Sequence, residues 1–280
     1  MKHILLLSMA IAVSWGTQAQ FHVFKSKKQA PDTSAAQSAT ATGFGVAPGK
    51  TPIKKKKHNQ ILPLSSFYVL TGKVRDSARV FLWLSIKDSV IKGQAIYAQS
   101  EDTFRVFGTV EPDSKLVICG FSPDGNMRGA FIGKIMDDSV FQGRWMALTS
   151  DSAWNCQLYK KDTMPSGIDT TMKADNVDGT YSYHLGDLGA AGGIIIHKVG
   201  QGSLSMDIGC AGPPPDLASA MIKIQEIPFD GQTSIYPSPG KPNCKLRVRI
   251  FKDFVVINFV NKENQCGYGA SVEGVFARIK

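Results

Sequence analysis

Few side chains in this sequence have the types and spacing that catalysis requires. His184 and Asp187 are close enough along the chain to form an acid–base pair, but a glycine-rich stretch typical of a surface loop surrounds them. Asp137 and Asp138 could act as a carboxylate dyad, although a solvated turn is the simpler interpretation. No phosphate-binding loop, His-Glu-x-x-His, Cys-x-x-Cys or Gly-x-Ser-x-Gly pattern occurs. The sequence predicts no catalytic residue and no cofactor.

A metal site has equally little support. Asp124, Gly125 and Asn126 match a fragment of a calcium loop, but the alternating acids and terminal Glu of such a loop are missing. We interpret these three residues as a hairpin turn and expect no metal ligands.

Three aromatic side chains are candidates for ligand contact. Phe81 and Trp83 alternate with the aliphatic residues of 80–84, so one strand would carry apolar groups on both faces. One face belongs to a core, and the other must pack against a second domain, the N-terminal segment or a partner. Packing against a second domain is the simpler interpretation, and ligand binding is the alternative. Tyr268, between two glycines, is the third candidate, on a loop that could equally be a simple turn.

The chain has five cysteines, so at least one has no partner within the chain. Cys244 begins a predicted strand and Cys266 follows the next one, which would bring the two thiols to the ends of a hairpin. We therefore expect a Cys244–Cys266 disulfide, which would also hold the Tyr268 loop. Closing a loop of about 23 residues is worth roughly 3 kcal/mol. Cys156 lies on the apolar side of its strand and is predicted to be a core group.

Short antiparallel strands are the elements that would position these residues. Between turn signals, residues 67–160 alternate apolar and polar side chains with period two. The predicted strands cover 67–73, 79–86, 90–97, 104–110, 116–121, 127–135, 141–145 and 154–158. Glycines inside them favour sharp bending, and closure would remove the sheet edges. The sequence predicts a small eight-stranded up-and-down barrel.

A polar stretch at 161–178, with Pro165 and Gly167, predicts a linker, and a second mainly β domain follows at 179–280. Its expected strands cover 179–183, 193–199, 203–210, 220–227, 245–251, 254–260 and 274–279. Residues 216–227 could instead form a short helix capped by Asp216.

The positive charge is unevenly distributed. The formal charge is +9, and residues 20–66 contribute +7 of it, from eight lysines and one acid. Residues 67–280 hold 23 basic and 22 acidic groups, a difference of +1, so nucleic-acid binding by a basic folded face is not expected. The composition of 20–66 predicts a disordered tether. Its Lys54, Lys55, Lys56 and Lys57 could contact an anionic surface, at about 1 kcal/mol per charge, or could simply be solvated.

The first nineteen residues have the pattern of a cleaved export signal. Lys2 precedes an apolar run at 4–13, and Thr17 and Ala19 provide the small-x-small cleavage pattern. The run is much shorter than the roughly 20 residues of a spanning helix. We expect a protein of the periplasm or the cell exterior, without a membrane span after cleavage.

Several segments carry a resemblance to known exported modules. The segments YVLTG at 68–72, IKGQ at 91–94 and FQGRW at 141–145 resemble uncharacterised β-barrel domains of exported Bacteroidota proteins, loosely of lipocalin or avidin shape. CKLRVR at 244–249, CGYG at 266–269 and GVF at 274–276 are similar to another exported module. Small periplasmic barrels that inhibit lysozyme share the size and the disulfide, but their inhibitory loop has no match here. The resemblance implies a fold and export, and no active site.

These patterns together favour an exported, non-catalytic binding or interaction protein of the cell envelope. Its partner would be an unknown protein or a small envelope ligand, and inhibition of a wall-degrading enzyme is one form of this role. The alternative is an envelope hydrolase with paired carboxylates, which need no local motif. A wide cleft with two carboxyl groups about 5–10 Å apart would favour the enzyme, and a filled barrel would not.

Overall fold

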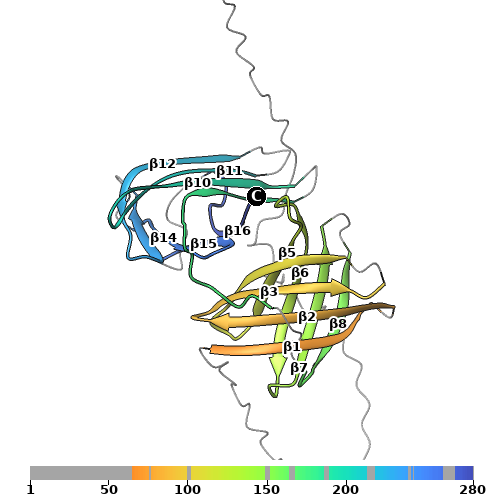
Figure 1. The fold of residues 1–280 in the computed structure, drawn as a ribbon. Helices are drawn as coiled ribbons and strands as arrows, with labels where there is room; N and C mark the ends of the chain where they lie inside the picture. The colour runs from red at the N-terminus through yellow and green to blue at the C-terminus, as the bar shows by residue number, and fades with distance from the viewer. Residues whose placement is uncertain are drawn as a thin grey trace, which may run out of the picture.

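The computed structural model describes residues 65–279 except 76, 100–101, 149–151, 164–167, 186–188, 213–217, 239–240, 242 and 261–268. All regular structure in the described part is β, in two units that Figure 1 shows side by side. No helix in this part is long and apolar enough to cross a membrane. The predicted signal segment and the four tether lysines Lys54–Lys57 lie outside the described residues. So do Asp187, Asp216, Cys266 and Tyr268.

The first unit is a closed antiparallel barrel, as predicted. Each strand pairs with the next along the chain, and β1 pairs with β8 to complete the ring. The strands are β1 (Ser65–Val74), β2 (Ala78–Lys87), β3 (Val90–Tyr97), β4 (Thr103–Val110), β5 (Leu116–Phe121), β6 (Met127–Met136), β7 (Val140–Ala147) and β8 (Ala153–Lys160).

Large apolar side chains fill the interior of this barrel. The alternation of the strands directs one face inward, and residues such as Leu82, Phe131 and Phe141 are almost fully buried there. Trp145 packs against Phe131, with 4.4 Å between the ring centroids, and also contacts Phe104. Cys156 belongs to the same cluster, at the core position predicted for it. The barrel is therefore a packed core.

Glycines allow neighbouring strands of the barrel to approach closely. A Cβ atom at Gly93 would collide with the carbonyl oxygen of Trp83 and would stand 3.0 Å from Cγ2 of Val106. A Cβ atom at Gly143 would likewise collide with the carbonyl oxygen of Ile132. The in-strand glycines thus permit the curvature that the sequence pattern predicts.

The second unit is an eight-stranded sheet that is nearly closed. Its order is β12-β11-β10-β9-β16-β15-β14-β13, so the first and last strands of this unit pair at its centre. The strands are β9 (Gly179–His184), β10 (Ala191–Gly200), β11 (Ser203–Ala211), β12 (Ser219–Pro228), β13 (Thr233–Pro237), β14 (Lys245–Ile250), β15 (Phe254–Phe259) and β16 (Gly274–Arg278). Between the two end strands, the Ser234 hydroxyl donates a hydrogen bond to the carbonyl oxygen of Pro228 at 2.8 Å.

Two details of this sheet differ from the sequence-based expectations. The region proposed as a short helix is a strand from Ser219 onward, because Ile222 and Ile224 are buried while Met221 is exposed. Strand β13 was not predicted. Its polar Ser234 is buried and its apolar Ile235 is exposed, so the hydrophobic pattern that identifies a strand is inverted there.

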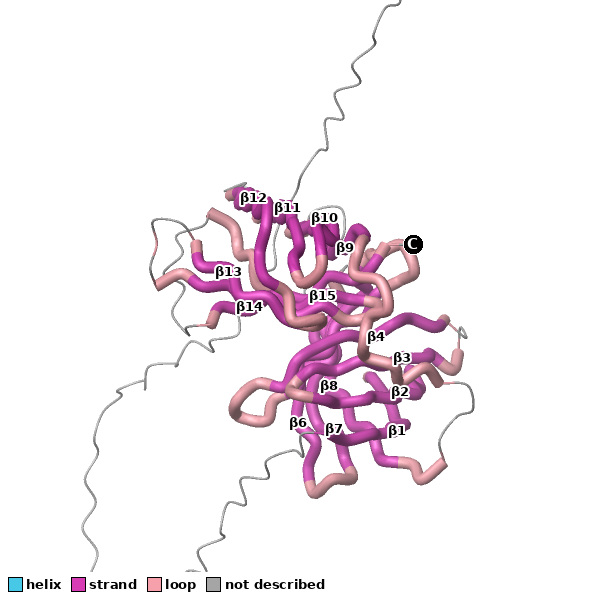
Figure 2. The backbone as a smooth tube through the Cα atoms, turned by 60° about the vertical axis from the view of Figure 1, so that its left-hand side comes forward, coloured by secondary structure: helices cyan, strands magenta, loops and turns pink. Residues whose placement is uncertain are grey.

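The outer wall of the barrel also contributes to the core of the second unit. Val90, Phe107 and Phe121 of the barrel belong to one apolar cluster with the inner face of the second sheet. Phe107 stacks on Phe254 of β15 with 4.4 Å between ring centroids. In Figure 2 the chain passes from β8 to the second sheet through a segment without strands. This linker at 161–178 is mostly polar, yet its Met172, Ala174 and Val177 are buried in the shared cluster.

Candidate functional site

An open hollow of about 1350 Å³ lies against the outer face of the barrel, over β1, β2, β7 and β8. These strands are apart from the wall β3–β6, which supplies the contacts with the second unit. We call this hollow the trough. Its floor is built from outward-facing side chains that the strand register places in rows.

The first row presents two exposed aromatic rings. Thr71 on β1 lies directly opposite Phe81 on β2 and directly opposite Tyr159 on β8. Phe81 is 43% exposed and Tyr159 is 51% exposed. Since neighbouring strands are about 4.8 Å apart, the Cα atoms of Phe81 and Tyr159 lie about 10 Å from one another across Thr71. Large exposed apolar side chains gathered at one place mark a candidate contact surface.

The second row, two residues further along β1, is cationic and amide-rich. Lys73 lies opposite Arg79 on one side and Gln157 on the other, and Gln157 lies opposite Gln142 on β7. Arg75 follows at the end of the trough, where its guanidinium carbon is 5.8 Å from the ring centroid of Trp154. Such a contact holds the cation in place over the ring.

The charge of the trough has one sign. Four cations line it, Lys73, Arg75, Arg79 and Lys161, and no Asp or Glu occurs among the described residues of its lining. Its chemistry therefore combines fixed positive charge, amide and hydroxyl groups, and aromatic faces. This combination suits an anionic ligand that is also rich in hydroxyl groups.

Of the predicted contact residues, only part lies in the trough. Phe81 lines it. Trp83 is 8% exposed, because its ring stacks on Phe67 and its Nε1 donates a hydrogen bond to Gln94 Oε1 at 3.1 Å. Neither residue belongs to the apolar cluster that the described residues share with the second unit, so this cluster gives no support to interdomain contact by Phe81 or Trp83.

The carboxylates that the sequence singled out occupy turns. Asp138 accepts a hydrogen bond from the Tyr68 hydroxyl at 2.6 Å and pairs with Lys160 at 2.9 Å. The hydrogen bond from Lys160, then that from Tyr68, holds the pKa of Asp138 below its ordinary value. Burial, then the bond to Asp138, raises the pKa of Tyr68 to about 12. Asp124 likewise accepts hydrogen bonds from Ser122 and Asn126 within the β5–β6 turn.

His184 is the last residue of β9, and the described residues contain no group of three or more His, Cys, Asp or Glu side chains that could hold a metal ion. The described cysteines that are free are Cys119, Cys156 and Cys210. Cys244 is buried and not free, and its predicted partner Cys266 lies outside the described residues. The Cys244–Cys266 pairing stays a prediction.

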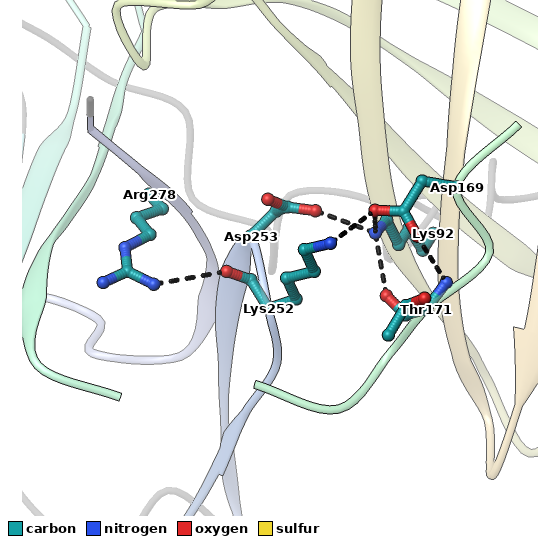
Figure 3. A network of polar contacts seen from close by, with 6 residues as sticks. All are labelled: Lys92, Asp169, Thr171, Lys252, Asp253 and Arg278. Carbon is teal, nitrogen blue, oxygen red and sulfur yellow. Dashed lines mark hydrogen bonds and ion pairs between the residues drawn. The ribbon is translucent and has the colours of Figure 1, made fainter. Parts of the chain in front are cut away.

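A second group of charges lies between the two units, as Figure 3 shows. Lys92 on β3 is only 5% exposed, and its Nζ lies 2.8 Å from Asp253 Oδ2 and 3.4 Å from Asp169 Oδ2. The same ammonium donates to the Thr171 carbonyl oxygen at 2.8 Å. Lys252 pairs with Asp169 at 2.9 Å, and its hydrogen bond is the main reason why the pKa of Asp169 is well below the ordinary value.

Two arginines extend this network. Arg278 donates to the carbonyl oxygens of Asn176, at 3.0 Å, and Asp178. Arg105 of the barrel donates to the carbonyl oxygen of Arg278 at 3.2 Å. Barrel, linker and second sheet are thus joined by ionic and hydrogen bonds, so we interpret this cluster as an interdomain connection, distinct from the trough.

Sequence reasoning found Phe81 and missed the other trough residues. A signal existed for Tyr159, which has the opposite parity from Cys156 and Leu158 of its strand. The register between β1 and β8 was not predicted, and it joins residues nearly ninety positions apart and creates both rows. No protein-family model, curated protein or solved structure matches the chain.

Proposed function

We propose that this chain is an exported, non-catalytic binding protein of the cell envelope, and that the trough is its ligand-contact surface. The observation that carries the proposal is the contrast between the two faces of the barrel. The inward face is filled by its own side chains, while the outward face over β1, β2 and β8 exposes aromatic rings beside cationic side chains. A ligand would therefore bind outside the barrel.

The hydrolase alternative receives no comparable support from the described residues. Asp138 is engaged by Lys160 and Tyr68, and Asp124 by its own turn. No carboxylate lines the described part of the trough, whereas glycoside hydrolysis needs two.

A retention experiment tests the proposed function. The mature protein is immobilised and exposed to soluble envelope polymers, and to purified lysozyme as a representative wall-degrading enzyme. We expect the immobilised protein to retain one of these ligands. The double variant Phe81→Ala with Tyr159→Ala should retain at least about tenfold less, because aromatic contacts carry much of the binding energy at such surfaces. Ile195→Ala and Ile235→Ala, at exposed positions of the second sheet, form the matched control.

Equal retention by the trough variant would eliminate the trough as the contact surface. Turnover of a glycan that one carboxylate substitution abolishes would establish the hydrolase instead.

Export rests on the N-terminal pattern and has its own test. The N-terminal sequence of protein recovered from the envelope or the medium should begin at Gln20. Recovery of the full-length chain from the cytoplasm alone would contradict export.

A further inference from the structure

We infer that the ligand of the trough is an anionic glycan, a polysaccharide whose sugar units carry carboxylate or phosphate groups. This inference rests on the proposed function and names the chemical class of its ligand.

The size of the trough favours an extended ligand. Pockets for small molecules enclose about 300–1,000 Å³, and the trough exceeds this while remaining open to solvent. The rows run across the strands, from β2 over β1 to β8 and, in the second row, to β7. A linear polymer lying across the strands would contact every member of a row.

The charge of the trough favours an anionic ligand. Lys73 and Arg79 lie directly opposite one another, and like charges in that position repel unless a counter-charge is present. No described acid of the lining supplies one. Guanidinium groups bind carboxylate and phosphate through paired hydrogen bonds, so Arg79 and Arg75 fit either anion.

The aromatic row specifies sugar rings. The Cα atoms of Phe81 and Tyr159, on either side of Thr71, are separated by roughly two strand spacings, or about 10 Å. Rings spaced in this way can each stack on a separate sugar unit of an extended chain, whose C–H groups face the aromatic plane. The amides of Gln142, Gln157 and Asn155 line the same trough and match the hydroxyl groups between the stacked units.

Other occupants fit less well. The N-terminal segment of this chain has eight lysines and one acid, so it would be repelled by the cations of the trough. A protein partner would favour a continuous, desolvated apolar centre, whereas Thr71 separates the two aromatic groups here and the cationic row lies beside them.

Titration of the mature protein with defined oligomers tests the inference. The probes are oligogalacturonate for carboxylate, a phosphorylated mannan for phosphate, neutral dextran, polyglutamate as an acidic polymer without sugar, and oligothymidylate as a nucleic acid. We expect one or both acidic glycans to bind, dextran to bind at least about tenfold more weakly, and the better acidic glycan to identify the anion.

Two variants examine the two halves of the recognition. Arg79→Gln and Phe81→Ala should each weaken binding of the acidic glycan at least about tenfold. Arg247→Gln and Ile235→Ala, exposed on the second sheet, should leave it unchanged. Because the lysines of the N-terminal segment also attract polyanions, all variants are compared in a chain in which Lys54–Lys57 are changed to Gln.

Three outcomes would overturn the inference. If Phe81→Ala leaves binding of the acidic glycan unchanged, the trough attracts polyanions without recognising sugar rings. Tighter binding of oligothymidylate or polyglutamate, lost in both variants, would identify another class of ligand. Protease-sensitive material retained from the envelope in a Phe81-dependent manner, with no acidic glycan bound, would identify a protein ligand and leave the proposed function standing.

Discussion

Lys92 is a buried cation whose partners come from two other parts of the chain, Asp169 of the linker and Asp253 of the second sheet. Removing the charge leaves Asp253 without its closest cation, so Lys92→Met should lower the free energy of unfolding by roughly 2 kcal/mol, below the 3–5 kcal/mol of a fully buried pair because both acids are partly exposed. Urea denaturation measures this. Lys134→Met, which breaks an exposed pair with Asp113, is the control and should cost less than about 1 kcal/mol. Equal losses in the two variants would contradict the structural role of Lys92.

The lowered pKa of Asp169 predicts how the free energy of unfolding changes with pH. Its pKa in the folded protein lies below the value of about 3.9 expected in the unfolded chain, chiefly through the hydrogen bond from Lys252. The ionised form is thus favoured by folding, and this stabilisation is fully present above pH about 4 and is lost as the pH falls through the folded-state pKa. Asp169→Asn should therefore lose less stability than the wild type below pH about 4. Denaturation curves from pH about 6 to pH about 3 give the comparison, and parallel curves would refute the assignment.

At the level of single residues, the sequence predicted which face of the sheet a side chain occupies better than how exposed that side chain is. The parity of Phe81 and Trp83 placed both on the outer face, where they are found. Their different exposure depends on Phe67 and Gln94, which the register brings beside Trp83. That information is tertiary and has no local pattern.

Strand glycines determine how closely the barrel can coil. Gly93→Ala should reduce the free energy of unfolding by about 1–3 kcal/mol, because the new Cβ would press on the Trp83 carbonyl oxygen. Gly193→Ala on β10 is the matched control, since the nearest atom there is 3.9 Å from a built Cβ, and it should change stability by less than about 1 kcal/mol. Chemical denaturation compares the two, and an unaffected Gly93→Ala protein would show that the strands can separate at little cost.

The elements themselves were largely predictable, for a physical reason. Strands with one face against a core alternate cleanly, as β7 and β8 do, whereas β3 and β5 bury residues on both faces because the second unit packs on their outer side. Strand β13 was not predicted because its buried residue is the polar Ser234, whose hydroxyl donates a hydrogen bond to the Pro228 carbonyl oxygen. The linker was predicted but its burial was not, because Met172, Ala174 and Val177 are dispersed among polar residues.

The shared apolar cluster predicts that the two units unfold together. All four tryptophans precede residue 160, so tryptophan fluorescence reports on the barrel, while far-ultraviolet circular dichroism reports on both units. We expect coincident thermal transitions. Leu246→Ala, in the core of the second sheet, should lower both midpoints equally, although no tryptophan lies in that sheet. A fluorescence transition that stays at the wild-type temperature would show that the units are independent.

For the whole molecule, the proposed ligand contact lies on the outer face of the first barrel, over β1, β2 and β8. Backbone hydrogen exchange of the mature protein, with and without the oligogalacturonate probe, locates the contact directly. We expect the probe to slow exchange in 71–81 and 153–161 of the wild-type protein, and to cause no change in these segments of the Phe81→Ala protein. Protection confined to β9–β16, with 71–81 and 153–161 unaffected, would contradict this proposal.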